Sequence, residues 1–296
     1  MRVKPAEKFC FGCEPLGGKD WGEFALQDVE RAVVRSVELG VSFFDTAAVY
    51  GLGLSEERLG KTLGSRRHDV VIATKGGLSW STKSTSANGR ARVFRDSSAK
   101  AIRNGVEASL RRLRLECLPL YYIHWPDLAT KFKETFDTLM ELKSEGKISS
   151  IGCSNFTVQQ LMECRCYADI DYVQVPVNLM DSNMSDQMLR FCEQNGVGVI
   201  AYNVLAQGLL TGKYSKDARF LSSDRRSRLP EFSGELFLET MDRVELLKSQ
   251  ARKHNLDLTT YAIRWALSRP GVTSVITGIK NVVQLETNLK AINEDC

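Results

Sequence analysis

The 296-residue sequence lacks any run of apolar residues that reaches the roughly 18 needed to cross a membrane. Its opening stretch, MRVKPAEKFCFGCEPLGG, also lacks the continuous hydrophobic region of a signal peptide. Long lysine or arginine runs are missing as well, and the net charge is only +4. These absences argue against nucleic acid or a membrane as partner, so we expect a cytoplasmic protein that binds a small molecule.

The sequence also lacks the paired C-x-x-C motifs of a zinc knuckle, although it contains eight cysteines. These are Cys10, Cys13, Cys117, Cys153, Cys164, Cys166, Cys192 and Cys296. Several lie within apolar runs, which favours reduced thiols in the core over a disulfide framework. We expect no metal site.

No internal repeat or linker-like tract divides the chain. Short apolar runs typical of strands instead alternate with segments of helical period, including 28–40, 98–113, 133–146 and 186–196. Eight strands are predicted, at 8–12, 41–45, 70–75, 120–124, 149–154, 171–175, 197–202 and 273–278. This alternation predicts an α/β protein in which residues 1–296 form one (β/α)8 TIM barrel domain, with its site at the carboxyl ends of the strands. Two long connections, 76–96 and 206–235, are expected to form walls or lids of that site.

The stretch VSFFDTAAVYGLGLSEERLG, residues 41–60, contains glycines between a predicted strand and a predicted helix, as a dinucleotide-binding loop would. However, Glu56 and Glu57 follow the predicted N-cap Ser55. Two carboxylates in the first turn complement the helix dipole and would repel a pyrophosphate. We therefore place the chemistry of this stretch on Asp45 and Tyr50.

Reactive side chains follow the carboxyl ends of several predicted strands. They are Asp45, Tyr50, Lys75, His124, Ser154, Asn155, Gln174 and Tyr202, with Gly278 after the last strand. Any one of them is compatible with an ordinary structural role. Together they predict a shared site, in which an ammonium group beside a tyrosine lowers the phenol pKa from about 10 and makes it a proton donor.

The same stretches resemble the aldo-keto reductase family. The matching segments span nearly the whole chain and are GVSFFDTAAVYGLGLSEERLG (40–60), VVIATKGG (70–77), EASLRRLRL (107–115), YYIHWPD (121–127), GKISSIGCSNF (146–156), VQVPVNLMD (173–181), LAQGLLTGKY (205–214) and SVITGIKNVVQLETNL (274–289). The resemblance implies an NADPH-dependent reductase of aldehydes or ketones. It assigns Tyr50 as general acid, Lys75 paired with Asp45 as the group that lowers the Tyr50 pKa, and His124 as the residue that orients the substrate carbonyl.

The resemblance also implies the cofactor site. It places Ser154, Asn155 and Gln174 on the carboxamide and the Tyr202 ring on the nicotinamide. The pyrophosphate would lie on Leu205, Gln207, Gly208, Leu210 and Lys213, and the adenosine end on Gly278, Lys280, Gln284 and Asn288. Lys280 is the candidate for the 2′-phosphate, so NADP is favoured over NAD. Arg225, Arg226 and Arg228 either close over the pyrophosphate or form a solvated loop. The family's usual pattern is interrupted at Asn203, Val204 and Leu205, at Thr277 and at Pro119.

Substrate identity is open at this point. Trp21, Trp80 and Trp125 form an aromatic wall of the substrate site or serve as ordinary packing. Arg90, Arg92 and Arg95 bind an anionic substrate or are simply solvated. Two other functions share the same residues: a cofactor-binding regulatory subunit with slow turnover, and a lyase that uses Lys75 as a Schiff-base amine. The sequence does not decide between a monomer and a homo-oligomer.

Overall fold

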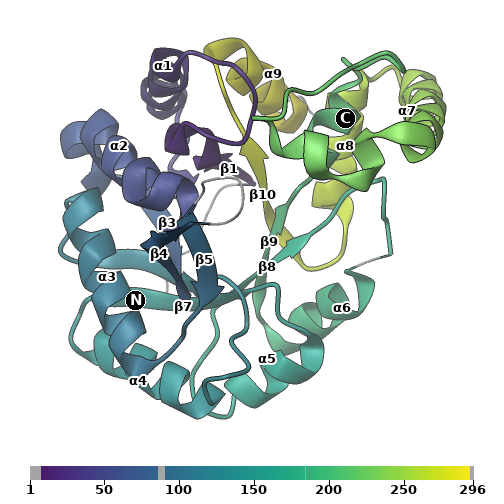
Figure 1. Ribbon diagram of the computed structural model, residues 1–296. Coiled ribbons are helices and arrows are strands. Elements are labelled where there is room, and N and C mark those ends of the chain that lie inside the picture. The colour runs from purple at the N-terminus through teal and green to yellow at the C-terminus, as the bar shows by residue number, and fades with distance from the viewer. Residues whose placement is uncertain (1–7, 86–90, 184, 294–296) are drawn as a thin grey trace.

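A computed structural model describes residues 8–85, 91–183 and 185–293 (Figure 1). Eight parallel strands close into a barrel in the order β1-β10-β9-β8-β7-β6-β3-β2. They are β1 (Phe9–Gly12), β2 (Phe43–Asp45), β3 (Val71–Gly76), β6 (Leu118–Ile123), β7 (Ile148–Ser154), β8 (Tyr172–Pro176), β9 (Gly198–Tyr202) and β10 (Val272–Gly278). Each overlaps a strand predicted from the sequence, and the (β/α)8 fold is confirmed.

Helices surround the barrel in Figure 1. They are α1 (Leu26–Glu38), α2 (Leu54–Leu63), α3 (Ala99–Leu113), α4 (Phe132–Ser144), α5 (Val158–Cys164), α6 (Asp186–Asn195), α7 (Gly234–Lys253), α8 (Leu258–Ser268) and α9 (Val282–Asn293). Side-chain oxygens cap several amino termini, as Ser98 does for α3 and Asp257 for α8. None of the helices within the described ranges is both long and apolar enough to span a membrane.

Two apolar layers hold the barrel together. Its interior is filled by buried side chains from alternating strand positions, among them Phe43, Leu120 and Tyr122. In a larger cluster, the outward-facing strand residues pack against apolar residues of the helices, such as Ala32 and Val33 of α1. Because most strands are buried on both faces, their sequences are nearly continuous apolar runs.

Both long connections contain regular structure. Residues 76–96 include an antiparallel hairpin, β4 (Leu78–Thr85) and β5 (Ala91–Arg95), where we expected only a loop. The 206–235 segment contains three short 3-10 helices, η4 (Ala206–Thr211), η5 (Arg225–Arg228) and η6 (Pro230–Phe232). An isolated bridge between Asp20 and Asp224 joins this segment to the loop after β1.

The start of α2 differs from its prediction. The helix begins at Leu54, and its N-cap is Gly53 with a φ of 99°, so the assignment of Ser55 as N-cap is wrong. The Ser55 hydroxyl instead donates to the Cys13 carbonyl, at 2.7 Å. This tertiary contact uses the hydroxyl that a cap would need.

The described cysteines are all free thiols. Five of them are buried: Cys10, Cys13, Cys153, Cys164 and Cys192. Cys296 lies outside the described residues. The core location expected for most of the thiols is therefore found.

Candidate active site

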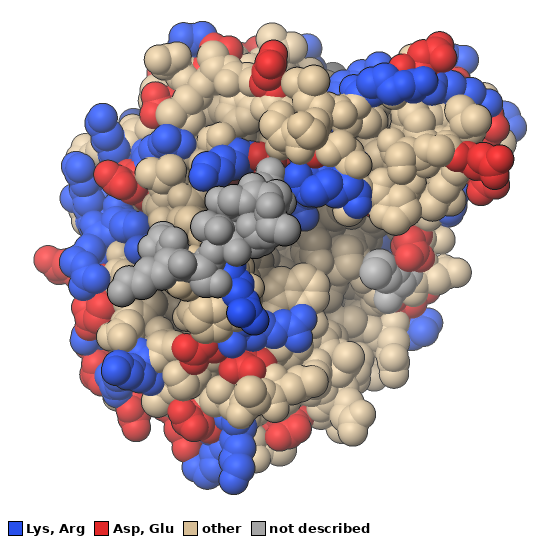
Figure 2. All heavy atoms as spheres, viewed as in Figure 1, with Lys and Arg blue, Asp and Glu red and all other residues tan. Residues whose placement is uncertain are grey.

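A cavity of about 730 Å³ opens at the carboxyl ends of the barrel strands. Figure 2 shows a hollow on this face with Lys and Arg side chains at its rim. Asp45, Tyr50, Lys75 and His124 all line the cavity. So does each predicted cofactor residue except Leu210, which is fully buried in the apolar cluster beneath α7 and α8.

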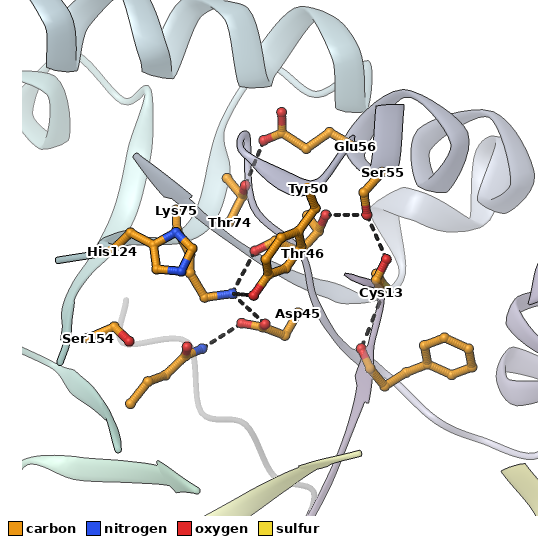
Figure 3. Close-up of polar contacts among 12 residues, drawn as sticks. Cys13, Asp45, Thr46, Tyr50, Ser55, Glu56, Thr74, Lys75, His124 and Ser154 are labelled. Atoms are coloured by element: carbon orange, nitrogen blue, oxygen red, sulfur yellow. Dashed lines mark hydrogen bonds and ion pairs between the residues drawn. The ribbon is translucent and has the colours of Figure 1, made fainter. Parts of the chain in front are cut away.

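The floor of the cavity contains a buried ion pair. Lys75 Nζ donates to Asp45 Oδ1 at 2.5 Å and to the Thr46 carbonyl at 2.8 Å (Figure 3). The other Asp45 oxygen accepts from Gln174 Nε2, also at 2.5 Å. Removing one member of such a pair would leave the other charge buried and uncompensated, so each residue stabilises the charge of the other.

Tyr50 lies above this pair, on the turn that follows β2. Its hydroxyl is 3.4 Å from Lys75 Nζ, and its ring meets His124 edge to face at a centroid distance of 5.9 Å (Figure 3). Burial raises the pKa of Tyr50 well above its ordinary value, and the carboxylates of Glu14 and Asp45 raise it further, while Arg225 lowers it. The prediction of a lowered Tyr50 pKa is wrong for this structure, because burial and two nearby carboxylates outweigh the Arg225 guanidinium.

His124 is held as a neutral imidazole. Burial lowers its pKa well below the ordinary value, and the Lys75 ammonium lowers it further. Its Nδ1 is buried and has no hydrogen-bond partner among the described residues. The residue lines the cavity, and a neutral imidazole can donate a hydrogen bond to a ligand or accept one from it.

The opposite wall is ordered by a chain of amide and hydroxyl contacts. Tyr202 Oη lies 2.6 Å from Asn155 Oδ1, and Asn155 Nδ2 donates to the His124 carbonyl at 2.9 Å. Asn155 adopts a φ of 66°, a conformation that asparagine tolerates better than most residues. Asn203 lies where the family's pattern is interrupted. Its Oδ1 accepts a hydrogen bond from the backbone N–H of Gln207 at 3.0 Å, which stabilises the following turn.

Basic side chains gather at the other end of the cavity. Lys213, Arg226 and Lys280 line it, and their mutual proximity contributes to the lowered pKa of Lys280. Burial is the largest cause of that shift, which brings the Lys280 pKa to about 8. Arg226 pairs with the buried Asp224, so three cations face one carboxylate.

Two of the three predicted substrate tryptophans, Trp21 and Trp125, line the cavity. Trp80 lies on β4 opposite Val93 and is not among the described lining residues. The Arg95 guanidinium lies over the Trp125 ring at 5.4 Å, Arg92 is exposed on β5, and Arg90 lies outside the described residues. An exposed Arg92 matches the solvated alternative.

In the loop after β1, the sequence analysis identified Trp21 but missed two acidic residues. Glu14 and Asp20 line the cavity, and Glu14 Oε1 accepts from Arg225 Nη1 at 3.0 Å. Arg225 also lies over the Trp21 ring, 5.3 Å from its centre. The rule that barrel sites lie after strand ends, applied to the first strand as well, would have identified Glu14.

The cavity fits a ligand rich in polar groups. Four of its lining residues have a buried side-chain atom without a partner among the described residues: Trp21 Nε1, His124 Nδ1, Gln207 Oε1 and Thr277 Oγ1. Buried polar atoms are normally hydrogen-bonded, so unpartnered atoms beside a cavity are compatible with a polar ligand. Among the described residues, no group of three or more His, Cys, Asp or Glu side chains is placed to hold a metal ion.

Comparison with known proteins places this site in a family. The model of the aldo/keto reductase family matches residues 8–295. The chain is 32% identical to aldo-keto reductase YhdN of Bacillus subtilis (strain 168), covering 95% of this chain and 83% of the relative. It is 31% identical to the NADH-specific methylglyoxal reductase of Escherichia coli (strain K12), covering 94% and 86%.

A solved structure is similar as well. The glycerol dehydrogenase AKR11B4 from Gluconobacter oxydans superposes with a TM-score of 0.88 at 32% identity, covering 99% of this chain and 88% of that chain. The family match over almost the whole length, the two relatives and this structural neighbour agree with the barrel fold. The chain belongs to the aldo/keto reductase family.

Proposed function

We propose that residues 1–296 form a single-domain NADPH-dependent oxidoreductase that reduces an aldehyde or ketone to an alcohol. The observation that carries the proposal is the convergence of Tyr50, Lys75, Asp45 and His124 at the floor of a cavity large enough for a dinucleotide and a small carbonyl compound. When bound, the reduced nicotinamide supplies a hydride to the carbonyl carbon. The chain's own residues supply orientation and a proton.

Tyr50 is the proposed proton donor. Its raised pKa keeps the phenol protonated at neutral pH, as an acid must be before the reaction. Lys75, 3.4 Å from the phenol oxygen, stabilises the negative charge that develops on Tyr50 as the proton leaves. Asp45 fixes the ammonium group, and the His124 imidazole, which lines the cavity, orients the substrate carbonyl.

The nicotinamide half of the cofactor would be held by Ser154, Asn155, Gln174 and Tyr202. Leu205, Gln207, Gly208 and Lys213 would hold the pyrophosphate, and Gly278, Lys280, Gln284 and Asn288 the adenosine. A preference for NADP is supported by the excess of cations around Lys280, which suits a 2′-phosphate. The relative from Escherichia coli is named NADH-specific, so this preference requires its own measurement. We propose a cytoplasmic location.

The test is reduction of a panel of aldehydes and ketones, followed by NADPH absorbance, with wild type and Tyr50→Phe. We expect the variant to bind NADPH normally but to lose turnover by about 100- to 10,000-fold, the usual contribution of a general acid. Undiminished turnover would refute the role of Tyr50. Slow turnover of the wild type on every compound would favour the regulatory-subunit alternative, and borohydride trapping of a carbonyl compound on Lys75 would favour the lyase.

A further inference from the structure

The first turn of α2 buries two polar side chains that the proposed reaction does not use. Ser55 and Glu56 are both fully buried. A buried carboxylate is costly unless it is paired and hydrogen-bonded. Glu56 meets both conditions, because it pairs with Arg112 Nε of α3 at 2.6 Å and accepts from Thr74 Oγ1 at 2.6 Å. The contact with Thr74 connects α2 to a barrel strand.

Thr74 immediately precedes Lys75 on β3. Side chains alternate along a strand, so Thr74 faces the helices while Lys75 faces the mouth of the barrel. Figure 3 shows Glu56 and Thr74 on one side of the strand and Lys75 with Tyr50 on the other. A restraint on the Thr74 side chain therefore fixes the backbone from which Lys75 projects.

Ser55 is connected to Lys75 indirectly, through Thr46. Its hydroxyl lies 2.8 Å from Thr46 Oγ1 and donates to the Cys13 carbonyl at 2.7 Å. The Thr46 carbonyl in turn accepts from Lys75 Nζ at 2.8 Å. Consecutive residues of one helical turn thus restrain both the backbone of Lys75 and one acceptor of its ammonium group.

The contact that these restraints protect is the weakest at the cavity floor. Lys75 Nζ and Tyr50 Oη are 3.4 Å apart, near the limit of a hydrogen bond, whereas the pair with Asp45 is much shorter. A small shift of Lys75 would keep the ion pair and lose the contact with the phenol. Misplacement of a reacting group by about 1 Å can cost about 100-fold in rate.

We propose that Glu56, acting through Thr74, is a positioning residue that holds Lys75 within reach of Tyr50, with Ser55 acting through Thr46 in support. The inference rests on the proposed function and adds residues outside the cavity to its machinery. Glu57 provides the contrast: it shares the same helical turn but is exposed. Any effect of charge on the helix dipole alone would be common to both glutamates.

The test compares Thr74→Val, which removes the hydroxyl at nearly constant shape, with Thr74→Ser, which keeps it. We expect Thr74→Val to lower kcat about 10- to 100-fold and to leave the Kd for NADPH unchanged, because Thr74 does not line the cavity. Its alkaline limb for reduction should move to higher pH, since loss of the Lys75 contact destabilises the tyrosinate. Thr74→Ser should restore both kcat and the pH profile, and Glu57→Gln should match wild type.

Ser55→Ala gives a second, independent variant if Thr74→Val does not fold, and it should change kcat and the pH profile in the same directions. The inference is overturned if both variants keep the wild-type kcat and pH profile while Tyr50→Phe abolishes turnover. It is also overturned if Thr74→Val and Thr74→Ser lose activity equally with an unchanged pH profile, which would indicate a structural role. A fully active Tyr50→Phe would instead reject the proposed function itself.

Discussion

The phenol of Tyr50 is surrounded by charges of both signs. Lys75 and Arg225 are the cations near the phenol, and Glu14 and Asp45 are the carboxylates. His124 is neutral. Because burial and the carboxylates raise the Tyr50 pKa, the protonated form persists to alkaline pH. We expect kcat/KM for carbonyl reduction to fall only above about pH 10, the ordinary phenol value, and the reverse oxidation to rise steadily with pH. Steady-state pH profiles in both directions check this, and a loss of reduction near neutral pH attributable to Tyr50 would contradict it.

Glu14 and Arg225 act on the same phenol in opposite directions. Removing the Glu14 charge should lower the Tyr50 pKa and move the alkaline limb of reduction to lower pH, whereas Arg225→Gln should move it to higher pH. Reduction by Glu14→Gln and Arg225→Gln across the pH range measures both shifts. Glu23→Gln, an exposed charge on the same loop, is the control. Shifts of the same sign in both variants would contradict this account.

At the scale of elements, the turn after β2 packs directly on the loop after β1. Gly51 has a φ of 61°, and a Cβ there would lie 2.5 Å from the Gly17 carbonyl oxygen. Gly51→Ala must therefore adopt an unfavourable backbone conformation and also separate the two loops. Gly146 has a φ of 74°, and a Cβ added there would have nothing within 4 Å. Gly146→Ala therefore measures the backbone cost alone, without a steric clash.

We expect Gly51→Ala to lower the free energy of unfolding by about 1–3 kcal/mol more than Gly146→Ala, in the range of overpacking costs. Chemical denaturation of the two variants measures this difference. Equal losses would show that the loops separate freely. Gly51 is thus accounted for by close packing against the Gly17 backbone, which requires no bound phosphate.

The sequence predicted the barrel strands well because most are compact apolar runs buried on both faces, as β6 and β7 are. The hairpin of β4 and β5 was missed because LSWSTKST is largely polar and lacks the apolar run by which the other strands were identified. Ser55 was misassigned as a cap because its real partner, the Cys13 carbonyl, is distant in sequence. Strand-end polar residues were found by position, whereas Glu56 became interpretable only through its contacts with Thr74 and Arg112.

At the scale of the whole molecule, the cavity is closed by segments far apart in the chain. The 206–235 segment meets the loop after β1 through the Arg228 pair with Asp20, at 2.9 Å, and the Arg225 pair with Glu14. The Lys280 ammonium, which precedes α9, donates to the Trp21 carbonyl of that same loop. The basic end of the cavity and the end that contains Tyr50 therefore share a wall, and the proposed cofactor site includes segments from both ends of the sequence.

The basic end of the cavity gives a pH-dependent prediction for the cofactor. Lys280 has a pKa of about 8, so its ammonium form prevails at pH 7 and is largely lost by pH 9. A 2′-phosphate loses that attraction as the pH rises, whereas NADH has no phosphate at this position. We therefore expect the affinity for NADPH relative to NADH to fall between pH 7 and pH 9.

Lys280→Ala should weaken NADPH binding at pH 7 by about 10- to 100-fold, the range for loss of one charge-assisted hydrogen bond, with little effect on NADH. It should also abolish the pH dependence of the ratio, because the titrating group is gone. Fluorescence titration of both cofactors at three pH values measures this, with Lys133→Ala, an exposed lysine on α4, as control. Equal weakening of NADPH and NADH would place Lys280 on a part common to both cofactors, and Lys213 and Arg226 would then be the remaining candidates for the 2′-phosphate.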